Sequence, residues 1–233
     1  MAEAVPGAVA TCDLTVRNAG AVNDSFRFEV KGDASSWARV KPPTLELAPT
    51  AEGVVQVVFN IPRSPWPAAG ALPVDVKVLS SAEPARPAVA QGVLRIAAFA
   101  DAYATLEPRL SHGRYRAQHI LTIHNRGNAP LGARISLART DSGLRADLSP
   151  AEINVAPGRC GSARVTVSRR LPRLWGAGPS RSFVLRVEAA GVPPVSLDAA
   201  MQQEAAGWGL RAAAVAGLLA LVGVVSLLAT LAG

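Results

Sequence analysis

The chain has 233 residues, of which 5% are aromatic, and it contains 18 prolines and 20 glycines. Pro and Gly interrupt regular elements, so this composition predicts many short elements and excludes a fold built from a few long helices. The net charge of +7 is uneven, because residues 1–100 are neutral and residues 101–204 carry an excess of +6. The two cysteines, Cys12 and Cys160, lie in different halves, which excludes a disulfide within either half.

The N-terminal segment, residues 1–20, lacks the features of a signal peptide. It has no basic start and no apolar run of the required length, and Glu3 and Asp13 interrupt it. If Met1 is the true start, we expect the part of the chain before residue 205 to lie in the cytoplasm.

Period-two alternation of apolar and polar residues predicts seven strands in the first half. In residues 25–31, for example, Phe26, Phe28 and Val30 alternate with polar residues. The predicted strands cover residues 9–17, 25–31, 37–41, 44–48, 54–61, 72–79 and 91–97.

The second half repeats the first at an offset of about 107 to 109 residues. Residues 14–20 match residues 121–127, and the seven strands recur at about 117–124, 132–138, 144–148, 151–155, 162–168, 182–189 and 195–201. The junction falls near residues 99–107. In both copies Asn and Gly (Asn18 and Gly20, Asn125 and Gly127) stand where we expect a turn with left-handed backbone.

Seven short strands in roughly 100 residues are typical of an immunoglobulin-like sandwich. The fold class that we predict is therefore all-β, with two tandem immunoglobulin-like β-sandwich domains. The first covers residues 1–100 and the second, which is basic, covers residues 101–204.

The pattern "LTVRNAG", a Trp, "P-x-x-L-x-L-A-P" and a late "V-x-V-x-V" strand resembles bacterial Ig-like domains of the CARDB and NPCBM-associated type. The paired arrangement before an apolar C-terminal segment is similar to actinobacterial membrane proteins labelled "hydrolytic protein". Some of these are encoded beside contractile injection systems. The resemblance covers about residues 5–204 and implies the sandwich fold, and it offers a contractile injection particle as a partner.

We expect no catalytic residues, no cofactor and no metal site. The sequence has no G-x-S-x-G elbow, no H-E-x-x-H motif and no phosphate-binding loop. Its histidines, His112, His119 and His124, do not share one strand face and have no cysteine nearby, so they do not form a zinc site. Acid pairs that assemble only in space stay open at this point, and with them a hydrolase.

An arginine-rich stretch lies around residues 169–181, where the first copy is nearly neutral. One interpretation is a membrane-proximal loop that contacts anionic lipid headgroups, at about 1 kcal/mol for each basic residue. The other is ordinary solvation of a domain rich in Arg. Aromatic residues that could stack on bases are scarce there, which argues against nucleic acid. The residues concerned are Arg169, Arg170, Arg173, Trp175 and Arg181.

The last residues, 212–233, form an uncharged apolar run after Arg211. As a helix, this run would span about 33 Å, which matches a bilayer core of roughly 30 Å. We therefore predict a single transmembrane helix after a juxtamembrane linker at residues 205–211, with Trp208 and Arg211 at the membrane interface. A buried core helix is the alternative, but nothing else in the chain could surround it. Small residues four apart in the run also allow helix pairing into a homodimer.

Charge sets the orientation that we expect. The basic half and Arg211 precede the apolar run and no charged side chain follows it, so the positive-inside rule places the N-terminal side in the cytoplasm. The leading hypothesis is a non-enzymatic, tail-anchored adaptor whose sandwiches bind a protein partner at the cell membrane. The alternatives are an anchored module that binds carbohydrate or cell-wall polymer outside the cytoplasm, and an uncharacterised hydrolase.

Overall fold

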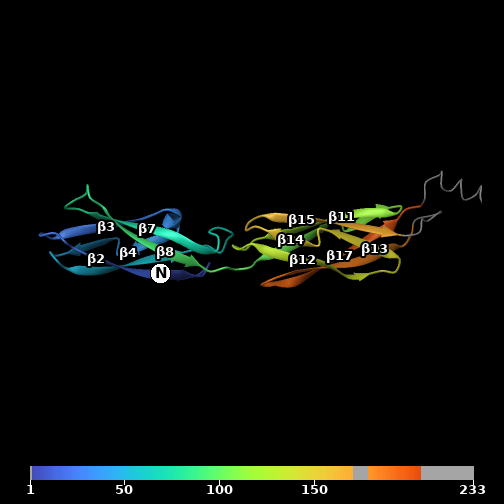
Figure 1. The fold of residues 1–233 in the computed structure, drawn as a ribbon, viewed down its shortest axis with the longest axis horizontal. Coiled ribbons are helices and arrows are strands. Elements are labelled where there is room, and N and C mark those ends of the chain that lie inside the picture. The colour runs from blue at the N-terminus through green and yellow to red at the C-terminus, as the bar shows by residue number, and fades with distance from the viewer. Residues whose placement is uncertain (1, 170–177, 206–233) are drawn as a thin grey trace, which may run out of the picture. The chain divides into compact units, whose positions relative to one another are not determined.

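The computed structural model describes residues 2–169 and 178–205, which form two compact β-units (Figure 1). Unit 1 comprises Met1–Ala102 and two short segments, Asn125–Leu131 and Ala156–Arg159. Unit 2 comprises Tyr103–His124, Gly132–Val155 and the described residues from Cys160 onward. In Figure 1 the strands of unit 1 run from blue to green and those of unit 2 from green to red.

Unit 1 is a sandwich of two sheets. The three-stranded sheet has the order β2-β6-β4, with β2 at Val9–Arg17, β6 at Glu52–Asn60 and β4 at Ala38–Lys41. The five-stranded sheet has the order β1-β8-β7-β3-β5, with β1 at Ala2–Ala4, β8 at Ala88–Ile96, β7 at Gly70–Ser80, β3 at Asp24–Lys31 and β5 at Thr44–Leu47. The short β1 pairs with β8 in parallel, at Leu94 to Ile96 only. A 3-10 turn, η1, covers Asp33–Ser36.

Alternation along the strands builds the core of unit 1. Val55, Val57 and Phe59 of β6 face inward and are at most 4% exposed. Val57 and Phe59 pack with Val74 and Val76 of β7 among others. Between them Gln56 faces solvent and Val58 is half-buried, as expected for antiparallel sheets with one wet face.

Unit 2 repeats this arrangement and adds a strand. Its five-stranded sheet has the order β10-β17-β16-β12-β14, with β10 at Leu110–Gly113, β17 at Val192–Gln203, β16 at Ser180–Ala189, β12 at Leu131–Thr140 and β14 at Glu152–Val155. The other sheet has four strands in the order β13-β15-β11-β9, with β13 at Leu144–Ser149, β15 at Cys160–Arg169, β11 at Arg116–Asn125 and β9 at Ala102–Glu107. Strand β10 pairs with β17 in parallel, as β1 does with β8.

The prediction of two all-β, immunoglobulin-like sandwiches is confirmed. All fourteen predicted strands are present, and most of their ends lie within two residues of the prediction. The sequence reading missed β1, β9 and β10, and β9 falls in the segment that we took for a junction. Strands of three to six residues carry little alternation, and β1, β9 and β10 lie outside the segments whose sequences match between the two copies.

The expectation of left-handed backbone at the Asn-x-Gly turns is wrong. Neither Gly20 nor Gly127 has a positive φ angle. The asparagines have another role, because Asn18 and Asn125 are 2% exposed and their side chains bond the turn backbone. Gly127 is needed for space, since a Cβ there would lie 2.5 Å from the carbonyl oxygen of Phe99.

The predicted linker beyond residue 205 and the predicted transmembrane helix at 212–233 lie outside the described residues, as do Trp208 and Arg211. Within residues 2–169 and 178–205, no helix has the length and apolar character needed to cross a bilayer.

Candidate functional site

Unit 1 has two open sheet edges that face the same side of its sandwich. Strand β2 ends its sheet, and no strand pairs with its outer edge among the residues that the structure describes. Strand β8 is covered by β1 only from Leu94 onward, so the edge of Ala88 to Val93 is unpaired in the part of the chain that the structure describes. Open edges expose unpaired backbone N–H and C=O groups and can accept a strand from another chain.

A cleft of about 210 Å³ opens between these two edges into the core of unit 1. We call it the edge cleft. Its walls are mostly apolar, and Asp13 is the one charged residue among those that line it. The lining residues are Cys12, Asp13, Leu14, Val57, Phe59, Val74, Val76, Ala90, Gln91, Gly92, Val93 and Leu94.

The exposure of inward-facing residues marks the edge cleft as an uncovered part of the core. Cys12 and Gly92 occupy inward positions of their strands and are nevertheless exposed. Val93 beside them is 40% exposed. In unit 2, strand β9 covers the edge of β11, which corresponds to β2, and Leu106 of β9 is 1% exposed. Unit 1 thus lacks, within its described residues, the strand that closes the same edge in unit 2.

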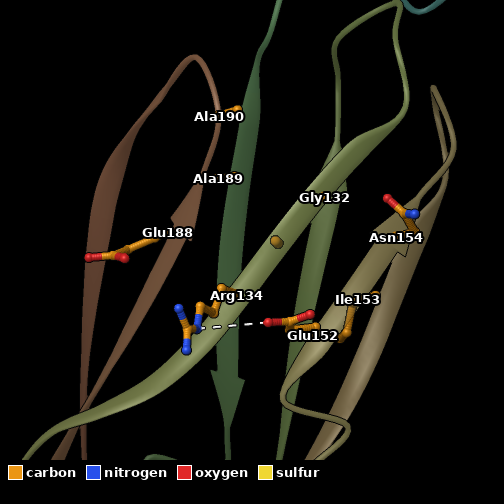
Figure 2. Close-up of a pocket in the computed structure, with 9 residues that line it drawn as sticks. Gly132, Arg134, Glu152, Ile153, Asn154, Glu188, Ala189 and Ala190 are labelled. Atoms are coloured by element: carbon orange, nitrogen blue, oxygen red, sulfur yellow. Dashed lines mark ion pairs between the residues drawn. The ribbon is translucent and has the colours of Figure 1, made fainter.

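A larger groove of about 560 Å³ lies on the outer face of unit 2, over β12, β14 and the end of β16 (Figure 2). Gly132 leaves the space, and Arg134 and Glu152 form an ion pair across it at 3.8 Å. Glu188 pairs with Arg186 at 2.6 Å. These side chains are about half or more exposed, so the pairs contribute little to stability. The groove is a solvated charged face whose acids and bases already neutralise one another.

Ser111 and His119 are the described residues that most resemble a nucleophile and its base. The Ser111 Oγ and His119 Nε2 atoms are 2.9 Å apart, and Nδ1 of the same ring bonds the carbonyl oxygen of Pro108. Ser111 is 5% exposed and His119 is fully buried, so a substrate cannot reach them. Burial lowers the pKa of His119 below its usual 6.5, and the bond to Pro108 opposes this shift. The pair joins β10 to β11, and therefore one sheet of unit 2 to the other.

The arginines of the predicted basic loop divide between described and undescribed parts of the chain. Arg169 ends β15, is partly buried, and donates from Nη1 to Oε1 of Gln203 at 2.8 Å. Arg181 lies on β16, and its Nε atom is buried. Arg170, Arg173 and Trp175 lie outside the described residues. Headgroup contact by this loop therefore stays a prediction.

Sequence reasoning missed the edge cleft, although a signal for it was present. The two copies align without gaps along the strands that border the cleft, and a comparison of side-chain size finds the first copy smaller at most of the inward positions there. Cys12 stands opposite Val57 where His119 stands opposite Val165, and Gly92 stands opposite Val74. Size differences between repeats could have pointed to this edge.

No known family model matches the sequence, and no curated protein matches it. The resemblance to CARDB-type domains and to proteins of contractile injection systems is therefore not supported by these comparisons. The solved structures that the chain resembles include the following three. A protein of unknown function from Porphyromonas gingivalis W83 is 14% identical, with 87% of this chain and 96% of that chain covered and a TM-score of 0.33.

The Pseudomonas aeruginosa CupB2 chaperone is 11% identical, with 82% and 92% covered and a TM-score of 0.30. Mouse clustered PcdhgC3 EC1-3 is 11% identical, with 78% and 56% covered and a TM-score of 0.42. Scores this low carry no functional argument. The assignment of the fold rests on the strand order and registers described above.

Proposed function

We propose that this protein is a non-enzymatic adaptor that binds a protein partner by adding a strand of that partner to the open edges of unit 1. The observation that carries the proposal is that the edges of β2 and β8 are uncovered within the described residues of unit 1, whereas the edge of unit 2 that corresponds to β2 is covered by a strand. Backbone pairing at such an edge provides affinity, and pockets for alternate side chains provide specificity.

Exposed apolar residues beside the edges support this role. Val9 of β2 is 63% exposed, and Val89 and Val93 of β8 are 55% and 40% exposed. Proteins that need to avoid association place charged residues, especially Lys, along an open edge. Strands β2 and β8 contain no lysine, and their charged residues are limited to Asp13, Arg17 and Arg95. The edge is therefore poorly protected against association, as a binding edge should be.

The membrane part of the proposal rests on the sequence. The apolar run at 212–233 would anchor the adaptor in the cell membrane, with the sandwiches on the cytoplasmic side and the basic residues around 169–181 toward anionic headgroups. The resemblance noted above makes a contractile injection particle the first partner to test.

The strand-addition proposal is tested with a photo-crosslinking residue placed at position 93 or 54 of the full chain in cells. Val93 borders the open edge of β8, whereas Val54 is equally apolar and 57% exposed but lies on β6, the middle strand of its sheet, directly opposite Thr15 of β2. We expect a protein partner to crosslink from position 93 and not from position 54, and V93K to abolish its recovery while V54K does not. Equal crosslinking from both positions would refute strand addition.

The anchor is tested separately by deleting residues 206–233 and following the protein through cell fractionation. We expect the shortened chain to leave the membrane fraction. A chain that stays with the membranes after this deletion would remove the anchoring part of the proposal and leave the edge proposal standing.

A further inference from the structure

We propose that the edge cleft of unit 1 is a side-chain pocket that receives one bulky apolar residue from the partner's added strand, with a basic residue of that strand beside Asp13. This inference rests on the proposed function and specifies the chemistry of the segment that binds. The occupant is an extended peptide segment of a protein partner, with apolar residues at alternate positions.

The registers of the two units show that the cleft is encoded by side-chain size. Val57 and Val165 are equivalent, and so are Val74 and Phe183, which fixes the pairing of the residues around them. Five lining residues of unit 1 are smaller than their equivalents in unit 2: Cys12 for His119, Val74 for Phe183, Val76 for Leu185, Ala90 for Leu197 and Gly92 for Ala199. Phe59 is the exception, since it is larger than its equivalent Val167, and it offsets only part of the lost volume.

The larger set in unit 2 fills its core. His119 and Phe183 are 0% exposed, their rings meet edge to face at 5.0 Å between centroids, and Leu197 is 5% exposed. The same positions in unit 1 leave Cys12 and Gly92 open to solvent. The core side chains of unit 1 are therefore too small at the place where, within its described residues, no strand covers the edge. One added strand that carries a large side chain would both cover the edge and fill the space.

The size of the cleft fits one such side chain. An engineered cavity of about 150 Å³ with apolar walls binds benzene, and the edge cleft measures about 210 Å³. A Leu, Ile or Phe side chain carried on a strand would occupy this space and remove its walls from water. Ala would leave most of the volume empty.

Charge selects the neighbouring residue of the occupant. Asp13 is the sole charged group among the cleft-lining residues, and it is exposed on the edge strand itself. An opposite charge directly across a strand pair stabilises the pairing, whereas a like charge opposes it. A segment with Lys or Arg near its apolar anchor therefore fits the edge better than an acidic segment.

Strand β9 provides a probe of known geometry, because it is the chain's own cover strand. Ala102, Ala104 and Leu106 occupy alternate positions of β9 and are its inward residues. The probe is a synthetic peptide with the sequence of residues 101–107, carrying D101K and E107K for charge and A104L for the anchor. The matched control retains Ala104, and a second control retains the acidic ends.

The readout is the alkylation rate of Cys12 in the full chain in detergent, followed by mass spectrometry. Cys160 is also an exposed free thiol but lies in unit 2, so it reports non-specific effects in the same molecule. We expect the Leu probe to slow the alkylation of Cys12 and not that of Cys160. Its dissociation constant should be at least about tenfold lower than that of the Ala probe, since each buried CH₂ group changes affinity roughly fourfold.

Filling the cleft provides the complementary test. A90L and G92A restore the residues of unit 2, and a Cβ at position 92 would lie 3.8 Å from the Val74 carbonyl oxygen, an ordinary contact. We expect the A90L/G92A protein to lose the preference for the Leu probe and to melt at a higher temperature than the wild type. The higher melting temperature separates a filled cleft from a misfolded unit.

Three results would decide against the pocket. Equal protection of Cys12 by the Leu and Ala probes would refute it while leaving strand addition intact. Failure of every probe to protect Cys12 would overturn the pocket. Crosslinking from position 93 would then test strand addition independently of the pocket. An undiminished preference for the Leu probe in A90L/G92A would place the probe elsewhere on the protein.

Discussion

Replacing Asn18 by Ala should destabilise unit 1 by about 3 kcal/mol. The Asn18 side chain is 2% exposed and makes three hydrogen bonds. Its Nδ2 atom donates to the carbonyl oxygens of Val22 at 2.9 Å and Leu47 at 3.0 Å, and its Oδ1 atom accepts from the amide of Gly20 at 2.9 Å. Each bond contributes about 1 kcal/mol, and a buried partner left unsatisfied raises the cost.

The loss of the bond to Leu47 should affect more than the turn at Asn18. It joins the end of β2 to β5, which belongs to the other sheet of unit 1, so N18A weakens the connection between the sheets as well as one turn. Because total stabilities of domains lie at about 5–15 kcal/mol, the loss is a large share of what holds unit 1 folded.

Native-state hydrogen exchange of the full chain is the suitable assay, because a chain with two units need not unfold in one transition. The free energy of opening should fall by about 3 kcal/mol for the amides of β2 and β6. Amides of unit 2 should be unchanged and serve as an internal reference. The matched control is N23A, at an exposed asparagine of the following loop. A loss below about 1 kcal/mol, or an equal loss in N23A, would refute the reasoning.

Three further predictions concern single groups. Burial depresses the pKa of His119 below 6.5, so in mild acid the unfolded chain binds a proton that the folded ring does not. Unit 2 should therefore lose stability as the pH falls below about 6.5. Calorimetry should find this loss in the wild type and not in H119Q. G113A should lower the melting temperature of unit 2 by at least about 5 °C, since its Cβ would lie 2.1 Å from the Arg116 carbonyl oxygen; an unchanged melting temperature would contradict that clash. The Ser80 hydroxyl and backbone amides donate to Asp24 and lower its pKa below 3.8. D24N should therefore destabilise unit 1 at neutral pH, and its difference in stability from the wild type should vanish as acid protonates Asp24. A difference that persists in acid would contradict a role for the charge of Asp24.

Much of each sandwich could be read from the sequence because strand signals are local. Alternation such as that of Phe26, Phe28 and Val30 requires one face of the strand to be buried, whatever covers it. The match between residues 14–20 and 121–127 then carried the strand pattern of one copy to the other. The buried role of Asn18 and Asn125 was missed because their positions suggested backbone conformation, while their partners, such as Leu47, lie far along the chain.

What the sequence determined by itself was the presence of fourteen strands, their inward faces and the repeat, since each follows from the order of apolar and polar residues. The tertiary structure alone decided which edges are closed. Strand β9 closes β11 in unit 2, and β2 in unit 1 has no such cover within its described residues. Edge pairing joins segments distant in sequence, and the volume left by Cys12 and Gly92 depends on the side chains that meet them across two sheets. Local periodicity contains neither quantity, so the edge cleft emerged only from the packed fold.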